Sequence, residues 1–539
     1  GYIYVVIVSF ILAESLDKMR DLSGKELGIM TAITGLYGLV NAFSDKLFVP
    51  SIYGAFGLLA ATLIMLFLLN SDKITFSKKR FRGIVLGMTA LVIFLNAKWF
   101  ITSGDDSYTH LDTYVSAGDS KKKISGTALK HLDEVPGADT DEFYRSTNLV
   151  TTGNLRSSSL LYGYNDVSTF SSTLNGGIVN YNNAMGNCRW NIVSIYDYNF
   201  RTYLNTLASV KYMGVAKKNT ATIPYGYKKV QETKNKYYSI YENQYSLPLG
   251  YTYDKIVNTD RIDQYSAAEK QETTMLAAIV EDKDMDKNSN LTVATKLPLT
   301  AQKLKIKNIK LNGVSMTKDT IEIEKPGATM KFSFEAPANA ETYLSLVGDI
   351  YAEKDAKEHF ITARIKAPGV KYGHKFRIDA YTTGQKEYLF NLGYREGAVK
   401  TCTLKFVGTG TLKYKDLAIY SQTMSNYADR VNALKENSLK NAKAEKNTVT
   451  GNITVDKDKM LVVTLPYQKG WTAYVDGKKT DIHRVNYQYI GINLKKGTHD
   501  IKLHYQLPGI KLAFMITGCG IIAFVAIIIF NIVRKRRKN

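Results

Sequence analysis

The sequence predicts a multi-pass α-helical membrane part joined to a large extracytoplasmic region with α/β and β-sandwich structure. Long apolar stretches occur near both ends of the 539-residue chain, Lys and Arg cluster beside them, and the polar stretch between them alternates like β-strands over much of its length. The apolar share of 45% is that of a globular protein, which fits a chain that is part lipid-embedded and part exposed to water.

The clearest membrane segment is the stretch Leu512–Val533, which contains no charged residue. As an α-helix its 22 residues span about 33 Å, enough for a bilayer core of about 30 Å. The basic tail Arg534–Lys538 follows directly. Because Lys and Arg concentrate on the cytoplasmic side of membrane helices, we expect residues 510–539 to form a membrane helix with a cytoplasmic tail.

Residues 1–101 are expected to hold about four more membrane helices. The loop 70–82 carries five basic residues and one acid, which places it in the cytoplasm, so the next helix leads outward and the final helix leads back. Both basic clusters therefore agree on a large extracellular region. The chain starts inside an apolar stretch, so we expect a partial first helix and a C-terminal fragment of a longer protein. The expected helices cover residues 1–13, 27–43, 47–69 and 83–101.

The polar region divides by composition. Residues 102–290 are rich in Tyr, Asn, Ser and Gly, with helix-like patterns at 199–207 and 260–279 and a strand-like run at 210–215, which predicts an extracytoplasmic α/β domain. Residues 291–425 alternate apolar and polar side chains between Pro-Gly and Gly-rich turns, which predicts a β-sandwich.

Residues 426–509 are predicted to form a helix and a small membrane-proximal β-module. The stretch 427–446 is polar and helix-prone, and strand-like runs follow it. Asp476-Gly477 lies between two of these runs and predicts a hairpin, because Gly accepts the positive φ that a type I′ turn requires. Trp471 lies on a short strand next to a turn, and we expect it to lie in the core or to brace the β-module against its neighbour.

Composition limits the functions. The formal charge is +22, but Lys and Arg are scattered through the polar region and cluster only at the membrane flanks, which argues against nucleic-acid binding. We expect as partners the lipid bilayer, a polyprenyl-phosphate sugar and an anionic cell-wall polymer. The three cysteines and seven histidines show neither a disulfide framework nor metal-ligand spacing, so no metal and no cofactor are expected. The abundance of Lys, Asn and Tyr suits a Gram-positive bacterium.

Two groups of residues are candidates for catalysis or substrate binding, although the sequence contains no short catalytic motif. Asp105 and Asp106 follow the fourth predicted membrane helix and suit a base acting on a lipid-linked sugar, with Lys98 and His110 neutralising its phosphate. The alternative is a solvated loop beside the membrane.

The second group has the side chains of a carbohydrate site, because aromatic faces stack on sugars while amides, carboxylates and guanidinium groups bind hydroxyls. The alternative is that these residues, like the nearby tyrosines, pack a loop-rich domain. The candidates are Asn165, Asp166, Asn187, Arg189, Trp190 and Asp197.

Six short stretches are distinctive as a set: Phe143–Arg145, Leu207–Tyr212, Ile240–Asn243, Leu247–Gly250, Asp260–Asp282 and Leu465–Lys478. Together they resemble the YfhO family of bacterial multi-pass membrane proteins. The resemblance covers nearly the whole chain. It implies a GT-C type glycosyltransferase that takes a sugar from undecaprenyl phosphate and adds it, outside the cell, to lipoteichoic or wall teichoic acid, with an inverting, metal-independent mechanism. The acidic base of such enzymes lies in the first outer loop, which is expected N-terminal to this sequence, so no catalytic residue is transferred to a position here.

Two other functions stay open. A non-enzymatic scaffold would bind wall polymer or another carbohydrate beside a separate enzyme. A transporter of lipid-linked sugars would need charged residues along a path through the membrane helices and little mass outside the membrane.

Overall fold

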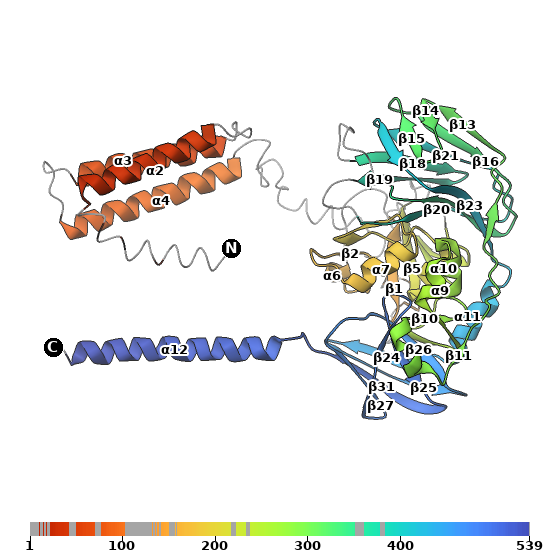
Figure 1. Ribbon diagram of the computed structural model, residues 1–539. Helices are drawn as coiled ribbons and strands as arrows, with labels where there is room; N and C mark the ends of the chain where they lie inside the picture. Colours follow the sequence, from red (N-terminus) through yellow and green to blue (C-terminus); the bar gives the residue numbers. More distant parts are fainter. Residues whose placement is uncertain are drawn as a thin grey trace. The chain divides into compact units, whose positions relative to one another are not determined.

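The computed structural model describes most of the chain and divides it into two units, Gly1–Lys123 and Ile124–Asn539. The described ranges are 22–42, 50–70, 77–102, 142–149, 159–216, 223–232, 238–350, 360–377 and 383–537, with isolated residues at 10, 15, 18, 132, 135, 137, 138 and 157. Figure 1 shows the elements of both units. Each unit is described by itself below.

The first unit contains α2 (Gly24–Ala42), α3 (Pro50–Leu69) and α4 (Lys78–Thr102). A capping box begins α2, because the Ser23 amide donates to Glu26 Oε2 at 2.7 Å and the Glu26 amide donates to Ser23 Oγ at 3.2 Å. Within the described residues, one helix is long and apolar enough to cross a membrane, namely α12 (Ile510–Arg536) of the second unit. The multi-pass membrane part therefore stays a prediction, and its first predicted helix lies outside the described residues.

The second unit begins with α/β structure. One sheet has the order β1-β5-β7-β6, in which β1 (Arg145–Leu149) pairs in parallel with β5 (Val210–Ala216). The predicted helix at 199–207 is α8 (Thr202–Leu207), and the predicted strand at 210–215 lies within β5. The other two strands are β6 (Tyr227–Glu232) and β7 (Tyr238–Asn243).

A seven-stranded sheet joins segments that are distant in the sequence, in the order β11-β9-β10-β29-β30-β26-β8. Its strands come from both sides of the β-sandwich, so the α/β part and the C-terminal part share one sheet. Four strands precede the sandwich and three follow it. They are β8 (Gly250–Tyr253), β9 (Lys255–Asn258), β10 (Ala278–Val280), β11 (Thr292–Val293), β26 (Lys459–Pro466), β29 (His483–Val485) and β30 (Tyr489–Leu494).

The single helix predicted over 260–279 is wrong in extent. Two short helices, α9 (Thr259–Asp263) and α10 (Ala267–Thr273), replace it, because Ser266 forms a new capping box with Glu269. The apolar end of the predicted helix is β10, which pairs with β9 and β29 inside the seven-stranded sheet. Sheet pairing therefore overrides the local helical pattern.

The β-sandwich consists of two main sheets around one large hydrophobic core. We call β12-β23-β17-β20 the junction sheet and β13-β16-β21-β18-β19 the open sheet. The junction sheet contains β12 (Gln302–Leu304), β17 (Ala340–Val347), β20 (Glu387–Arg395) and β23 (Asp416–Thr423). The open sheet contains β13 (Asn308–Asn312), β16 (Thr329–Ser333), β18 (Phe360–Ala367), β19 (Val370–Arg377) and β21 (Thr401–Val407). A small third sheet contains β14 (Val314–Met316), β15 (Thr320–Ile323) and β22 (Gly410–Lys413).

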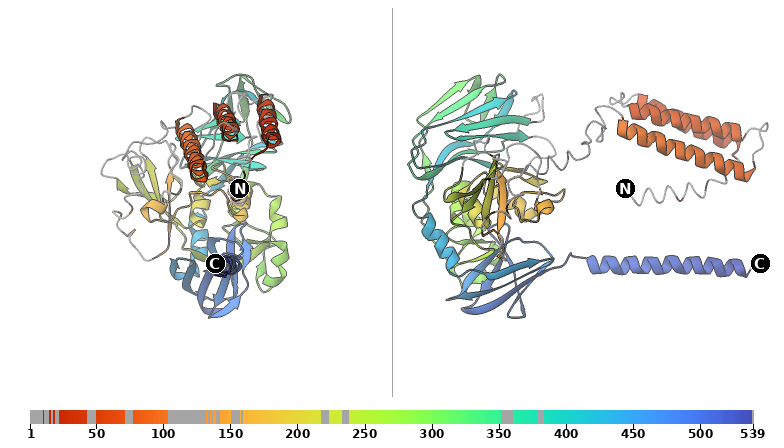
Figure 2. Two further views of the ribbon diagram at one scale, coloured as in Figure 1. Left: turned by 90° about the vertical axis from the view of Figure 1, so that its left-hand side faces the viewer. Right: turned by 180° about the vertical axis from the view of Figure 1, so that it is seen from behind.

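Buried polar side chains fix the junction sheet to the α/β part. Glu272 of α10 accepts a hydrogen bond from Arg430 Nη1 at 2.6 Å, and the same carboxylate accepts from the amides of Thr300 and Ala301. Glu341 of β17 accepts from the Thr202 amide at the start of α8. These contacts join five segments of the chain, so the sandwich and the α/β part form one body, as the two views of Figure 2 also show.

The last part contains α11 (Tyr427–Glu436) and a sheet of order β24-β25-β31-β27-β28. The predicted helical stretch 427–446 is too long, because β24 (Lys440–Glu445) pairs with β25 (Thr448–Val455). The predicted hairpin is present: Asp476 and Gly477 have φ of 52° and 76° and connect β27 (Trp471–Val475) to β28 (Lys478–Thr480). The strand β31 (Gly497–Tyr505) then leads to α12.

Candidate functional site

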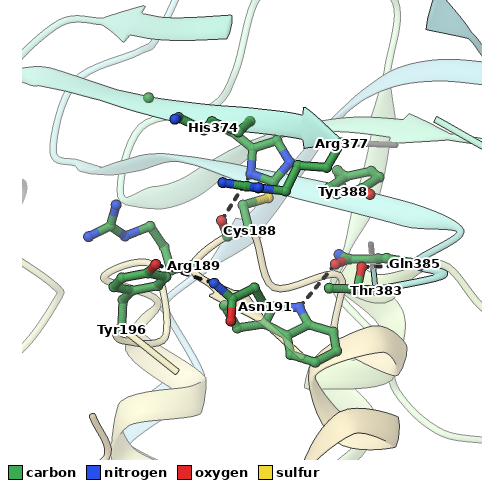
Figure 3. Close-up of a pocket in the computed structure, with 12 residues that line it drawn as sticks. Cys188, Arg189, Asn191, Tyr196, His374, Arg377, Thr383, Gln385 and Tyr388 are labelled. Carbon is green, nitrogen blue, oxygen red and sulfur yellow. Dashed lines mark hydrogen bonds between the residues drawn. The ribbon is translucent and has the colours of Figure 1, made fainter. Parts of the chain in front are cut away.

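A small polar cavity lies where the α/β part meets the edge of the open sheet (Figure 3). One wall is the segment 188–196, and the other consists of β19 and the start of β20 with the residues just before it. Its volume is about 190 Å³. Sites for drug-sized ligands measure about 300–1,000 Å³, so this cavity fits one small group and not an oligomer.

The first wall is a short hairpin with internally satisfied polar groups. β3 (Trp190–Asn191) and β4 (Ser194–Ile195) pair antiparallel, and Asn191 Oδ1 accepts from the Val193 amide at 3.0 Å to fix the turn. Asn187 supports the hairpin from behind. It is fully buried, its Nδ2 donates to Asn182 Oδ1 at 2.7 Å, and its Oδ1 accepts from the Arg189 amide at 3.0 Å.

The cationic group of this wall is held by a carboxylate. Arg189 Nε and Nη2 each donate to Asp197 Oδ2 at 3.1 Å, and Asp197 Oδ1 accepts from the Asn199 amide at 2.7 Å. Burial opposes the charge of Arg189, but the Asp197 carboxylate outweighs burial and raises the pKa of Arg189. The guanidinium carbon lies 5.6 Å from the ring centroid of Tyr196, so cation and ring form one surface.

The indole of Trp190 is fixed by an amide and is not a free stacking platform. Trp190 Nε1 donates to Gln385 Oε1 at 3.0 Å, and Gln385 Nε2 donates to the Asn187 carbonyl at 3.0 Å. Only 6% of Trp190 is exposed. Tyr196 also lines the cavity and is partly exposed, so it is the better placed of the two aromatic residues for stacking.

The second wall contributes a neutral histidine. His374 Nδ1 lies 3.0 Å from the Cys188 carbonyl oxygen, to which it donates (Figure 3), so Nε2 is an acceptor. Nε2 is buried and has no hydrogen-bond partner among the described residues. Burial lowers the pKa of His374 to about 4, which keeps the ring uncharged at neutral pH. Burial also raises the pKa of the neighbouring Cys188 thiol, so this sulfur is not a reactive thiolate.

The cavity is therefore lined by hydrogen-bonding groups of several kinds, partly exposed ring surface and three cationic side chains, of which Arg189 is paired with Asp197. Such a lining suits a sugar hydroxyl or an anionic substituent. Within the described ranges no three His, Cys, Asp or Glu side chains gather as metal ligands would. The groups that face the cavity besides Arg189 and His374 include Asn191, Thr383, Lys375 and Arg377.

The structure brings together only part of the predicted second group. Arg189 and Trp190 line the cavity, while Asn187 and Asp197 lie behind its wall. Asn165 and Asp166 belong to a turn beside β1 and do not line the cavity. The Asp166 carboxylate accepts from the Ser168 amide, and burial raises its pKa to about 7.

The first predicted group lies mostly outside the described residues, so its arrangement stays a prediction. Lys98 lies in α4 of the other unit. Asp105, Asp106 and His110 fall outside the described residues.

Sequence reasoning missed the second wall. His374, Lys375, Arg377, Gln385 and Tyr388 line the cavity but lie almost 200 residues from Arg189 in the sequence. The only local sequence signal is the alternation of apolar and polar residues in β19. That pattern predicts a strand, but it does not predict which part of the protein packs against the edge of its sheet.

A second and larger cavity, about 670 Å³, lies near the chain entry to the second unit. Phe143, Tyr144, Lys211 and Lys435 are among its lining residues. Burial and the neighbouring Lys211 lower the pKa of Lys435. Because Lys211 Nζ also lies 5.5 Å from the Tyr144 ring centroid, this cavity combines aromatic and cationic surface.

Comparison with solved structures gives distant similarities. The carbohydrate-binding module CBM35 from Paenibacillus barcinonensis is 10% identical, with a TM-score of 0.17 over 22% of this chain and 97% of the module. The arabinofuranosyltransferase AftD from Mycobacteria is also 10% identical, with a TM-score of 0.24 over 77% of this chain and 41% of AftD. At these TM-scores neither similarity contributes to the argument.

Comparison of sequences is more informative. The chain is 25% identical to "Uncharacterized protein YfhO" of Bacillus subtilis (strain 168), over 99% of this chain and 60% of that protein. It therefore spans about 60% of the length of this curated relative. The family described as "Bacterial membrane protein YfhO" matches residues 1–517. That match covers far more than half of the sequence, and the chain belongs to the YfhO family of bacterial membrane proteins.

Proposed function

We propose that the whole protein is a membrane glycosyltransferase that moves a sugar from undecaprenyl phosphate to an extracellular acceptor such as lipoteichoic or wall teichoic acid. Membership of a membrane-protein family and the apolar helix α12 support a reaction at the bilayer. In this proposal the part of the second unit before α12 lies outside the cell, α12 crosses the membrane, and the C-terminus is cytoplasmic. Neither a metal nor another cofactor takes part.

The observation that carries the proposal is the cavity lined by Arg189, Tyr196 and Lys375. Its hydroxyl, amide and guanidinium groups suit a sugar or a phosphate-bearing unit, and its small volume suits one such unit at a time. We assign to this cavity the binding of the acceptor end. The catalytic base is placed outside the described residues.

The test is sugar transfer by the full-length protein in liposomes. The donor is an undecaprenyl-phosphate sugar, the acceptor is poly(glycerol phosphate), and the readout is sugar incorporated into the polymer. Tyr196→Ala combined with Lys375→Gln removes ring surface and charge from the cavity. We expect kcat/KM for the acceptor to fall at least tenfold, about 1.4 kcal/mol of transition-state stabilisation, with the KM for the donor unchanged.

The matched control is Tyr474→Ala combined with Lys479→Gln. These two residues are partners across the β27–β28 hairpin, away from the cavity, and the control should leave both constants unchanged. If no donor supports sugar transfer while the protein still binds the polymer, the result would support the scaffold function instead. Movement of the lipid-linked sugar across the bilayer without transfer would support the transporter.

A further inference from the structure

The outward face of the open sheet carries cations and no acid. Strand alternation sends every second side chain of its five strands away from the core, and none of these outward positions is Asp or Glu. Seven of them are exposed basic residues: Lys310, Lys331, Arg364, Lys366, Lys371, Lys375 and Lys405. We call these seven residues the basic face.

The strand register arranges these cations in rows across the sheet. Lys310 lies opposite Lys331, and on the far side Lys366 lies opposite Lys371. Thr403 completes this row between the two pairs, because it lies opposite both Lys331 and Lys366. At about 4.8 Å between strands, the five positions extend over about 19 Å. In the next row Arg364 lies opposite Lys405.

Such a row is unfavourable for the folded protein alone. Like charges directly opposite on neighbouring strands repel each other, and the register produces three such pairs. None of the seven basic residues forms an ion pair with a carboxylate among the described residues, whereas exposed lysines elsewhere do: Lys303 pairs with Asp416 at 2.6 Å and Lys495 pairs with Asp458 at 2.8 Å. A linear anion along the row would replace this repulsion by attraction.

The basic face also continues into the cavity. Lys375 belongs to both, and β19, which forms one edge of the open sheet, is the strand that supplies His374 and Arg377 to the cavity. The Lys310–Lys371 row ends at Lys371, and Lys375 lies four residues farther along β19, about 13 Å away at about 3.3 Å per residue. A chain on the row that then turned along β19 would reach the cavity with its end. Within the described residues the outward positions of the five strands are polar or basic, apart from Gly373 and the apolar Phe360 and Val407, which fits a hydrated polymer better than insertion into lipid.

We propose that the basic face binds a linear phosphodiester polymer along the Lys310–Lys371 row and directs its end into the cavity. The identification of that polymer as the acceptor of sugar transfer rests on the proposed function. The binding itself does not, because it requires neither donor nor catalysis.

Binding is tested with the full chain in detergent, with fluorescent poly(glycerol phosphate) as the probe and dextran of similar length as the neutral comparison. The variant changes Lys310, Lys331, Lys366 and Lys371 to Gln. We expect Kd to rise at least about 30-fold at low salt, and the slope of log Kd against log salt to fall by about 3, since each cation lost releases fewer counterions.

The control removes the same total charge at Lys303, Lys386, Lys457 and Lys495, each of which pairs with an aspartate. It should change Kd less than threefold. Equal weakening in both variants would mean that only net charge matters and would overturn the proposal, as would wild-type affinity in the row variant.

Vesicles with 30% phosphatidylglycerol test the alternative of a lipid surface. Binding to these vesicles, and not to the polymer, through the same four lysines would assign the face to a membrane and overturn the proposal. A thermal unfolding midpoint at or above that of the wild type shows that the row variant is folded. Sugar transfer is measured separately, so the absence of transfer leaves a positive binding result intact.

Discussion

The two main sheets of the β-sandwich share one core, yet their outward faces differ. The junction sheet turns Glu341 and Asn391 toward the α/β part, where Thr202 and Asn199 satisfy them. Ser345 donates to Glu387 of the same sheet, whose carboxylate also accepts from the Ala267 amide of α10. The open sheet turns long cationic side chains toward solvent. β17 is buried along nearly its whole length, whereas β18 alternates between buried and exposed positions. The covered face therefore carries polar side chains with fixed protein partners, whereas the seven exposed basic residues of the open face form no ion pair with a carboxylate among the described residues.

The largest expected effect concerns the buried ion pair of the covered side. Arg430→Met leaves Glu272, which is fully buried, without its cation, and we expect the unfolding free energy to fall by about 3–5 kcal/mol. Lys303→Met breaks the exposed pair with Asp416 and should lower it by less than about 1 kcal/mol. Chemical denaturation of the full chain measures both. Equal losses of unfolding free energy in Arg430→Met and Lys303→Met would contradict the proposed difference between the buried and the exposed ion pair.

The next effect concerns close packing at the junction. Gly186 has φ of 58°, and a Cβ there would lie 2.9 Å from the Ala267 Cβ and 3.1 Å from the Leu389 Cβ. We expect Gly186→Ala to lower stability by about 2–4 kcal/mol through backbone strain and overpacking. The counterpart on the open sheet is Gly373, whose nearest neighbour would be the Ala363 carbonyl oxygen at 3.7 Å. Gly373→Ala should be neutral or raise the midpoint of thermal unfolding, which checks both variants.

A third effect is the pH dependence of folding stability, which a buried carboxyl group on the covered side produces. Burial raises the pKa of Glu341 to about 7, so the folded state holds this proton more tightly than the unfolded state. Its stabilising contribution is present at low pH and is lost as the pH rises from about 4.5 to 7, by at most about 3 kcal/mol. Thermal unfolding between pH 5 and 8 should therefore show a smaller decline in Glu341→Gln than in the wild type.

The control for this prediction is an exposed carboxylate near the open sheet. Hydrogen bonding to Lys307 lowers the pKa of Glu335 below its usual value, so Glu335→Gln should not alter the decline between pH 5 and 8. A decline that persists in Glu341→Gln would show that another group carries the titration.

The smallest effect on stability concerns the basic face itself. Lys366→Gln relieves the repulsion with Lys371 across the β18–β19 ladder, and we expect a gain of a few tenths of a kcal/mol. Differential scanning calorimetry at low and high salt measures this gain in unfolding free energy. The gain should vanish at high salt because salt screens the repulsion. A loss of stability would mean that Lys366 has a structural partner.

Local chemistry made part of this fold predictable. The hairpin at Asp476-Gly477 follows from the φ that Gly permits, and the final helix follows from an uninterrupted apolar stretch. The helix over 260–279 failed because Ser266 starts a new cap and β10 finds strand partners that are distant in the sequence. The multi-pass membrane part remains a prediction.

The candidate site was less predictable for the same reason. Arg189 and Trp190 stood out as residue types, but burial by Gln385, which lies far along the chain, makes Trp190 a structural residue. The sequence suggested that basic residues are scattered. Strand register instead collects seven of them on one face, which no window along the chain reveals.

The central claim is that the basic face and the cavity together hold the acceptor. It is tested most directly by the KM values of the full-length protein in liposomes, with Lys310, Lys331, Lys366 and Lys371 changed to Gln. The account predicts that the KM for poly(glycerol phosphate) rises at least tenfold while the KM for the undecaprenyl-phosphate sugar stays within twofold of the wild type. An unchanged KM for the polymer, or a parallel rise in both constants, would contradict it.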